Sequence, residues 1–187
     1  MMVPLYAHAG RSVYRVRQFV AALRAGIAPL GPDDLSQAQS YLPVTAWPLF
    51  LSMARGDQQH SLNVLRTLQQ RGQLNPILAQ AALLHDCANH GEGVRLWHRV
   101  AVVLLAVLAP SLLSRWAKAA PSRDSWRYPF WAHLNHPQRG AALAGAAGCD
   151  PLAVSLIAHH QNHSPGRIDR PEILPWLAEL QAADDDN

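Results

Sequence analysis

The sequence predicts an all-α fold, organised as a single-domain helical bundle. Apolar residues recur at helical spacing through most of the 187 residues, and no stretch shows the sustained alternation of apolar and polar residues that is typical of strands. Several segments begin with a capping side chain followed directly by proline, which is a common start of a helix. With 49% hydrophobic residues, a chain of this length can bury one sizeable core. We therefore expect a core domain at 46–187, with residues 1–45 as a helical extension packed on it.

The N-terminal part is predicted to hold two helices. The stretch from Ser12 to Ala25 has the pattern of an amphipathic helix. The stretch from Ile27 to Asp34 contains a glycine and two prolines and is expected to be a connector. Asp33 or Asp34 is then expected to cap a second helix, which runs to about Tyr41.

In the middle of the chain the sequence predicts a long helix, followed by a helix with a clearly marked N-terminus. The long helix is expected from about Val44 to Gln70, with a break near Gly56 and a stop at Gly72, because glycine commonly ends helices. Asn75 should cap the next helix, with Pro76 at its first position. That helix ends in the sequence AALLHD.

The C-terminal part predicts three further helices. One starts at 136–137, where histidine precedes proline, and closes at Gly148. The next starts at 150–151, where aspartate precedes proline. The last runs from about Pro171 into the acidic end of the chain.

One apolar segment, from Val100 to Leu113, has to be weighed as a membrane span. It is bounded by Arg99 and Arg115 and interrupted by Pro110. Crossing a bilayer needs roughly 20 apolar residues, so this segment is too short. We expect a helix buried in the bundle and no transmembrane span, with an amphipathic helix lying on a membrane surface as the alternative.

Charge and cysteine content restrict the classes of partner and compartment. The formal net charge is +3, and no basic block stands out, so we expect no stable complex with nucleic acid. Cys87 and Cys149 are far apart and form no CxxC, which argues against a disulfide framework and against a thiolate metal site. The first residues lack the pattern of a secretory signal, so a cytoplasmic location is expected.

The chemistry of the sequence lies in its ten histidines, several of which stand at predicted helix ends or beside carboxylates. A single histidine on a helix is more often a core or capping residue, but imidazole and carboxylate groups together are the ligands that Zn, Mn, Fe and similar divalent ions prefer. The candidate metal ligands are His60, His85, Asp86, His136, His159, His160 and Asp184.

The paired histidines near the end of the predicted helix after 150–151 are expected to face inward. At about 100° per residue, His159 lies near the azimuth of Leu152 and Leu156, and His160 lies beside it. A buried imidazole must satisfy two nitrogens, and metal coordination plus one hydrogen bond does so. The alternative is a mutually packed pair with backbone partners.

The order of these residues resembles the HD superfamily of metal-dependent phosphohydrolases. The resemblance covers about two-thirds of the chain, and the HPxxGA and HH spacing is similar to the HD-GYP branch. It implies an HD-type metal-binding helical domain at 46–187. The matching elements are His60, ALLHD at 82–86, HPQRGA at 136–141, AHH at 158–160 and AD at 183–184.

The resemblance also implies one or two divalent metal ions, of the kind Mn, Fe, Zn, Ni or Mg. The ligands of a primary ion would be His60, His85, Asp86 and Asp184, with Asp185 as the alternative to the last. Those of a second ion would be His136, His159 and His160, with Asp86 bridging both ions.

The implied activity is hydrolysis of a phosphomonoester or phosphodiester in a small phosphorylated or nucleotide substrate. A metal-activated water would attack phosphorus, with Asp86 as the catalytic residue that orients or deprotonates it. The chain departs from the family at 85–89, where the usual HDxGK reads HDCAN, and it carries no GYP element after the HH pair. Arg95, Arg99 or Arg139 is a candidate substitute for the missing lysine. The alternative is a catalytically degenerate HD domain that acts as a signalling or partner-binding module.

Overall fold

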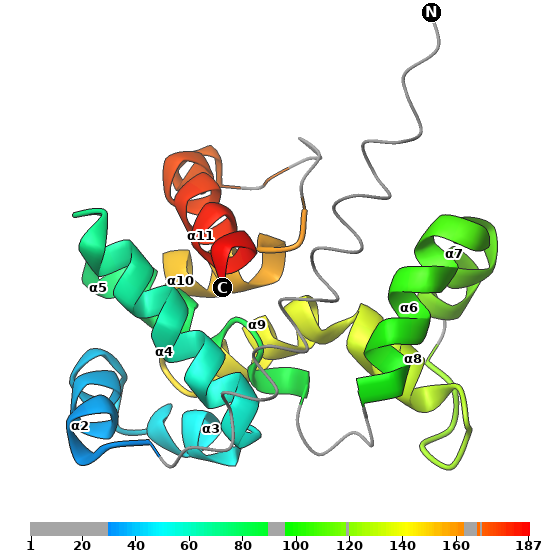
Figure 1. The fold of residues 1–187 in the computed structure, drawn as a ribbon, viewed down its shortest axis with the longest axis horizontal. Helices are drawn as coiled ribbons and strands as arrows, with labels where there is room; N and C mark the ends of the chain where they lie inside the picture. Colours follow the sequence, from blue (N-terminus) through cyan, green and yellow to red (C-terminus); the bar gives the residue numbers. More distant parts are fainter. Residues whose placement is uncertain (1–29, 90–95, 119, 163–167, 169) are drawn as a thin grey trace, which may run out of the picture.

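The structure is a computed structural model that describes residues 30–89, 96–118, 120–162, 168 and 170–187. Within these ranges every regular element is helical and there is no strand, which confirms the predicted all-α class (Figure 1). The helix predicted from Ser12 to Ala25, and most of the connector after it, lie outside the described residues.

The first described helix, α2 (Pro32–Tyr41), ends where the sequence predicted but begins differently. Its N-cap is Gly31, and neither Asp33 nor Asp34 takes that position. The Asp34 carboxylate instead accepts a hydrogen bond from the Gly31 N–H at 3.3 Å. An acidic residue in the first turn stabilises the helix by this bond and by its favourable interaction with the helix dipole.

The predicted long helix is two helices, α3 (Trp47–Ser52) and α4 (Arg55–Gln70). The break lies at Met53 and Ala54, which adopt extended backbone conformations, so the helix is interrupted near Gly56 as the sequence predicted. The Gln58 side chain donates hydrogen bonds of 2.9 and 3.2 Å to the carbonyls of Phe50 and Leu51, so it ties the end of α3 to the first turn of α4. At the far end Gly72 has a φ of +69°, which confirms the predicted stop after α4.

The helices that follow start at the predicted caps. The Asn75 side chain accepts a hydrogen bond of 2.9 Å from a first-turn N–H of α5 (Pro76–Leu84). Asp150 does the same at 2.7 Å for α10 (Pro151–His159). Between them α9 (His136–Ala146) closes at Gly148, whose φ is +78°. The chain ends in a short 3₁₀ turn, η2 (Pro171–Ile173), and α11 (Leu174–Asp186).

The core lies where α4, α5, α9, α10 and α11 pack against one another (Figure 1). Its centre is made of side chains with no exposed surface, each of which stabilises the fold by about 1.5–3 kcal/mol when buried. They include Phe50, Leu62, Leu65, Leu83, Leu84, Leu156, Ile157 and Leu180. This packing brings the ends of α5, α9 and α10 together with the middle of α4 and the last turns of α11.

A second group of helices lies at the side of this core (Figure 1). It consists of α6 (Leu96–Leu108), α7 (Pro110–Lys118) and α8 (Tyr128–Leu134), which contact one another. Pro110 starts α7, so the apolar segment is split between two helices. The expectation that this segment is buried was wrong for one face, because Leu104 is 54% exposed and Leu108 is 78% exposed. Among the described helices none has the length and apolar character needed to cross a membrane.

Candidate metal centre

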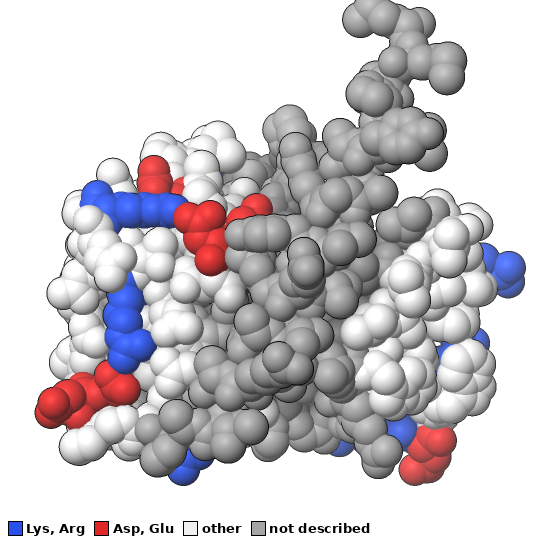
Figure 2. All heavy atoms as spheres, in the orientation of Figure 1, with Lys and Arg blue, Asp and Glu red and all other residues white. Residues whose placement is uncertain are grey.

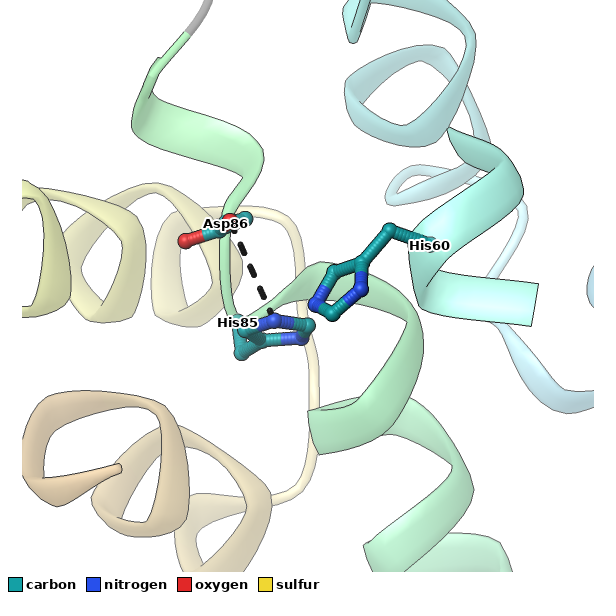
Figure 3. Close-up of side chains that lie close together, drawn as sticks. All are labelled: His60, His85 and Asp86. Atoms are coloured by element: carbon teal, nitrogen blue, oxygen red, sulfur yellow. Dashed lines mark ion pairs between the residues drawn. The ribbon is translucent and has the colours of Figure 1, made fainter. Parts of the chain in front are cut away.

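Five helical segments contribute histidine or aspartate side chains to one buried cluster. His60 lies within α4, and His85 and Asp86 follow the last residue of α5. Figure 3 shows how these three side chains approach one another from the two segments. The remaining members are His136 at the first position of α9, His160 at the C-cap of α10 and Asp184 near the end of α11.

The first part of the cluster joins α4, α5 and α11. One ligand atom from each of His60, His85 and Asp86 lies within 4.8 Å of the other two. His60 Nε2 is 2.8 Å from Asp184 Oδ1, and His85 Nε2 is 3.5 Å from the same oxygen. His85 Nε2 is also 3.9 Å from Asp86 Oδ2. Two imidazoles and two carboxylates therefore converge at this point.

The second part shares Asp86 with the first. Ligand atoms of Asp86, His136 and His160 again lie within 4.8 Å of one another. Asp86 Oδ1 is 3.0 Å from His136 Nε2 and 3.9 Å from His160 Nε2. The two oxygens of Asp86 thus face different histidine groups, which is the arrangement expected of a carboxylate that bridges two cations.

Three of the rings are held in one orientation by the backbone. Nδ1 of His85 donates to the Ala82 carbonyl at 3.0 Å, and Nδ1 of His160 donates to the Ile157 carbonyl at 2.8 Å. Nδ1 of His136 is bonded in the same way, at 2.5 Å, to the carbonyl of His133. A carbonyl can only accept, so Nδ1 carries the hydrogen and, in a neutral ring, Nε2 presents its lone pair to the cluster. Histidine ligands of metal ions are commonly oriented by such a bond.

The donor set fits a metal ion because its ring nitrogens and carboxylate oxygens face one another at short distances. His136 Nε2 and His160 Nε2 face each other at 3.2 Å, although both are acceptors in the neutral rings. His85 Nε2 is buried and has no hydrogen-bond partner. A buried polar atom without a partner costs about 1–3 kcal/mol, so these lone pairs and the carboxylates around them favour a cation between them.

Burial and charge shift the pKa values of the cluster in opposite directions. Burial alone would lower the pKa of His85, but the nearby carboxylates of Asp86 and Asp184 raise it to about 9. Burial, with the positive charges of His85 and His136, lowers the pKa of His160 to about 4. Burial would raise the pKa of Asp184, yet its hydrogen bond with His60 and the nearby His85 ring hold it well below its usual range. Perturbed groups of this kind cluster at functional sites more often than elsewhere.

The structure does not bring two of the candidate residues into these groups. His159 is half-buried, and its Nδ1 accepts a hydrogen bond of 3.1 Å from the Asn162 side chain, which leaves the ring hydrogen on Nε2. Its tautomer is therefore the reverse of that in the three oriented rings, and its role as a ligand stays a prediction. Asp185 is exposed, whereas its neighbour Asp184 contacts the histidines, which fixes the register of the acidic run.

Some residues that support the cluster carried no clear sequence signal. The carbonyls that orient the rings belong to Ala82, His133 and Ile157, each three positions before its histidine, and every residue type has such a carbonyl. Gln181 donates bonds of 3.0 Å to the carbonyls of both His160 and Asn162, so it joins α11 to the end of α10. These contacts depend on how the helices pack, which periodicity alone does not specify.

Comparisons with models of known protein families, with curated proteins and with solved structures found no match. The functional interpretation therefore rests on the geometry of the cluster.

Proposed function

We propose that the chain is a metal-dependent phosphohydrolase of the HD type. The observation that carries this proposal is the contact between His136 Nε2 and His160 Nε2, two ring nitrogens held as acceptors at 3.2 Å beside the Asp86 carboxylate. Such a pair is stable when a cation lies between its members. Six side chains from five segments meet at this point, as the HD ligand order implies.

The residues divide into two sets that would hold one or two divalent ions. His60, His85 and Asp184 would form the first set, and His136 and His160 the second. Asp86 belongs to both sets. Mixed nitrogen and oxygen donors suit Mn, Fe, Zn or Ni, and Mg less well. When bound, a divalent ion polarises phosphoryl oxygens and acidifies water.

Asp86 is the candidate catalytic residue because it is the member shared by both sets. Its carboxylate would accept a proton from the attacking water and hold that water in line with phosphorus. The oxygen of that water would then bond to phosphorus as the ester P–O bond breaks, and the proton held by Asp86 would pass to the leaving oxygen. Asp184 would keep His60 oriented through the bond at 2.8 Å.

Of the three candidate substitutes for the cation that HDxGK would supply, Arg139 is the one whose side chain lies within the described residues; Arg95 and the side chain of Arg99 lie outside them. Arg139 follows His136 by one turn of α9, and its Nη1 donates to the carbonyl of Ala88, two residues after Asp86, at 3.4 Å. Its guanidinium also lies 5.6 Å from the centre of the Trp131 ring. A phosphate bound at the cluster would lie within the field of this cation, which favours a small anionic phosphoester as the substrate.

A degenerate, partner-binding HD module is the second candidate. It is favoured by the segment 87–89, which forms a 3₁₀ turn with all three side chains buried. None of the three is a cation, so this turn contributes no charge to phosphate binding. Burial raises the pKa of Cys87 to about 12, with Asp86 adding to the effect, so that thiol stays protonated.

Turnover of phosphoesters separates these candidates. Protein reconstituted with Mn, Fe, Zn or Ni should hydrolyse members of a panel of phosphomonoesters, phosphodiesters and nucleotides. Asp86→Asn should reduce kcat by at least about a hundredfold, the usual effect of losing an acid–base group. Asp185→Asn, an exposed carboxylate near the cluster, is the matched control and should leave kcat unchanged. Metal-loaded protein that turns over no member of the panel would support the module instead.

A further inference from the structure

We propose that the side group formed by α6, α7 and α8 is a docking surface for the headgroup region of an anionic phospholipid bilayer. This inference is independent of the metal centre. It rests on an exposed apolar stripe, on exposed tryptophans and on the distribution of charge over these three helices.

The stripe lies along one face of α6. Trp97 is 54% exposed, Leu104 54% and Leu108 78%. Leu104 and Leu108 follow Trp97 by seven and eleven positions. At about 100° per residue, all three side chains therefore fall within about 40° of arc around the helix. Among the described residues eight large hydrophobic side chains are exposed; three of them lie on α6, and a fourth, Trp126 at 67%, lies in the turn before α8. Large apolar side chains exposed along one face of a helix are a feature of interaction sites.

The stripe is continued by an aromatic cluster centred on Phe130 in α8. The rings of Trp97 and Trp126 lie 5.6 and 6.2 Å from the ring of Phe130, so the two exposed tryptophans flank the same buried residue. Trp116 of α7 also contacts Phe130, at 5.2 Å. Tryptophan is enriched where proteins meet the membrane–water interface, because its ring is apolar and its indole N–H is polar.

The stretch of chain that forms these helices carries mostly positive charges. Between residues 96 and 134 the sequence has four arginines and one lysine, and Asp124 is the one acidic residue. On α7 the exposed positions 111, 114, 115 and 118 form one face that ends in Arg115 and Lys118. Figure 2 shows the described surface over α6 and α7 as white, with blue side chains at its edge. Each cation near an anionic membrane surface contributes about 1 kcal/mol of attraction.

A bilayer fits these features better than a second copy of the chain. Two identical faces rich in cations repel each other, whereas anionic headgroups neutralise them while the acyl boundary receives the leucines. An interfacial helix does not need the length of a transmembrane span, and α6 has 13 residues. The surface therefore lies on the membrane without crossing it.

Vesicle sedimentation with the full chain tests this inference. The probes are vesicles of phosphatidylglycerol mixed with phosphatidylcholine, and vesicles of phosphatidylcholine alone. The wild-type protein should bind the anionic vesicles, and roughly 0.5 M salt should weaken that binding because it screens exposed charges. Leu104→Gln/Leu108→Gln should lower the partition coefficient about tenfold or more. Leu143→Gln/Leu174→Gln, with leucines that are 42% and 47% exposed on α9 and α11, is the matched control and should bind like wild type.

Tryptophan fluorescence provides a second readout that needs no variant. Bound protein should show a blue shift and quenching by brominated acyl chains, because Trp97 and Trp126 are exposed to water without vesicles. Asp86→Asn should bind vesicles as wild type does. The proposal would be overturned if wild-type protein did not bind anionic vesicles. It would also be overturned if Leu104→Gln/Leu108→Gln bound them as strongly as wild type. Loss of a concentration-dependent dimer in the stripe variant, without vesicle binding by wild type, would assign the surface to a second copy instead.

Discussion

His60 and Asp184 are 124 positions apart along the chain, yet His60 Nε2 lies 2.8 Å from Asp184 Oδ1. The contact joins the middle of α4 to the last turns of α11, and His85 approaches the same carboxylate from α5. Asp184 therefore faces both histidines of the first part of the cluster, so its removal should affect the metal centre.

Asp184→Asn should weaken metal binding by at least about tenfold, since loss of a carboxylate that orients a histidine ligand commonly has an effect of that size. The amide keeps the shape but removes the charge that faces His60 and His85. Competition with a chromophoric chelator measures the affinity. Asp185→Asn changes the neighbouring, exposed carboxylate and should leave the affinity as it is. Equal affinities for both variants would remove Asp184 from the site.

Metal binding should release protons at neutral pH. In the metal-free protein the pKa of His85 is raised from 6.5 to about 9. Protonated His85 stabilises the metal-free folded protein. This stabilisation is complete below pH 6.5 and is lost as the pH rises through 9. A metal ligand must be deprotonated, so the apparent affinity should rise about tenfold per pH unit in this window. The pKa of His160 is about 4, so that ring is already neutral there.

Calorimetric titration in buffers of different ionisation enthalpy measures this release. We expect about one proton per ion bound near pH 7.5. An affinity that is flat between pH 6.5 and 9 would contradict the role of His85 as a ligand.

Removal of the metal should destabilise the folded protein. An ion present at a hundred times its Kd adds about 2.7 kcal/mol to the free energy of unfolding. For a chain of this size that corresponds to a loss of about 5–10 °C in Tm when a chelator is added. The same chelator should not change the Tm of His85→Ala/Asp86→Ala. If the chelator left the Tm of the parent protein unchanged, the cluster would hold no ion.

Gly148→Ala should destabilise the fold because this residue has a φ of +78° between α9 and α10. A side chain in that region costs about 1–2 kcal/mol. Gly56→Ala is the control: the added Cβ meets nothing within 4 Å in the first turn of α4. It should be neutral or stabilising by up to about 1 kcal/mol. Chemical denaturation measures both variants, and equal stabilities would show that the turn is not strained.

The elements that sequence predicted well are those with local, chemically specific starts and stops. Asn75 and Asp150 cap their helices because a side-chain oxygen reaches an N–H two or three residues ahead, and Gly72 and Gly148 end theirs with positive φ. The break between α3 and α4 lies just before Gly56, which is itself part of the first turn of α4. The actual break depends on Gln58 binding carbonyls of the preceding helix, a contact that spacing does not reveal.

The candidate site was predicted only in part, because the packing of the helices decides which side chains enter it. Adjacent histidines lie about 100° apart on a helix, so packing decides which of them enters a cluster. Here His160 is buried at the end of α10, while His159 binds Asn162. The choice between Asp184 and Asp185 likewise depended on the rotation of α11 against α4, which only the packed structure supplies.

The metal content of purified protein tests the account most directly. Elemental analysis should find a transition metal in at least stoichiometric amount, bound where His136 and His160 face each other beside Asp86 and where His60 and His85 meet Asp184. His85→Ala/Asp86→Ala, folded as judged by circular dichroism, should lose most of that metal. A parent protein that carries no transition metal and takes up none on reconstitution, or a variant that retains the full amount, would contradict the account.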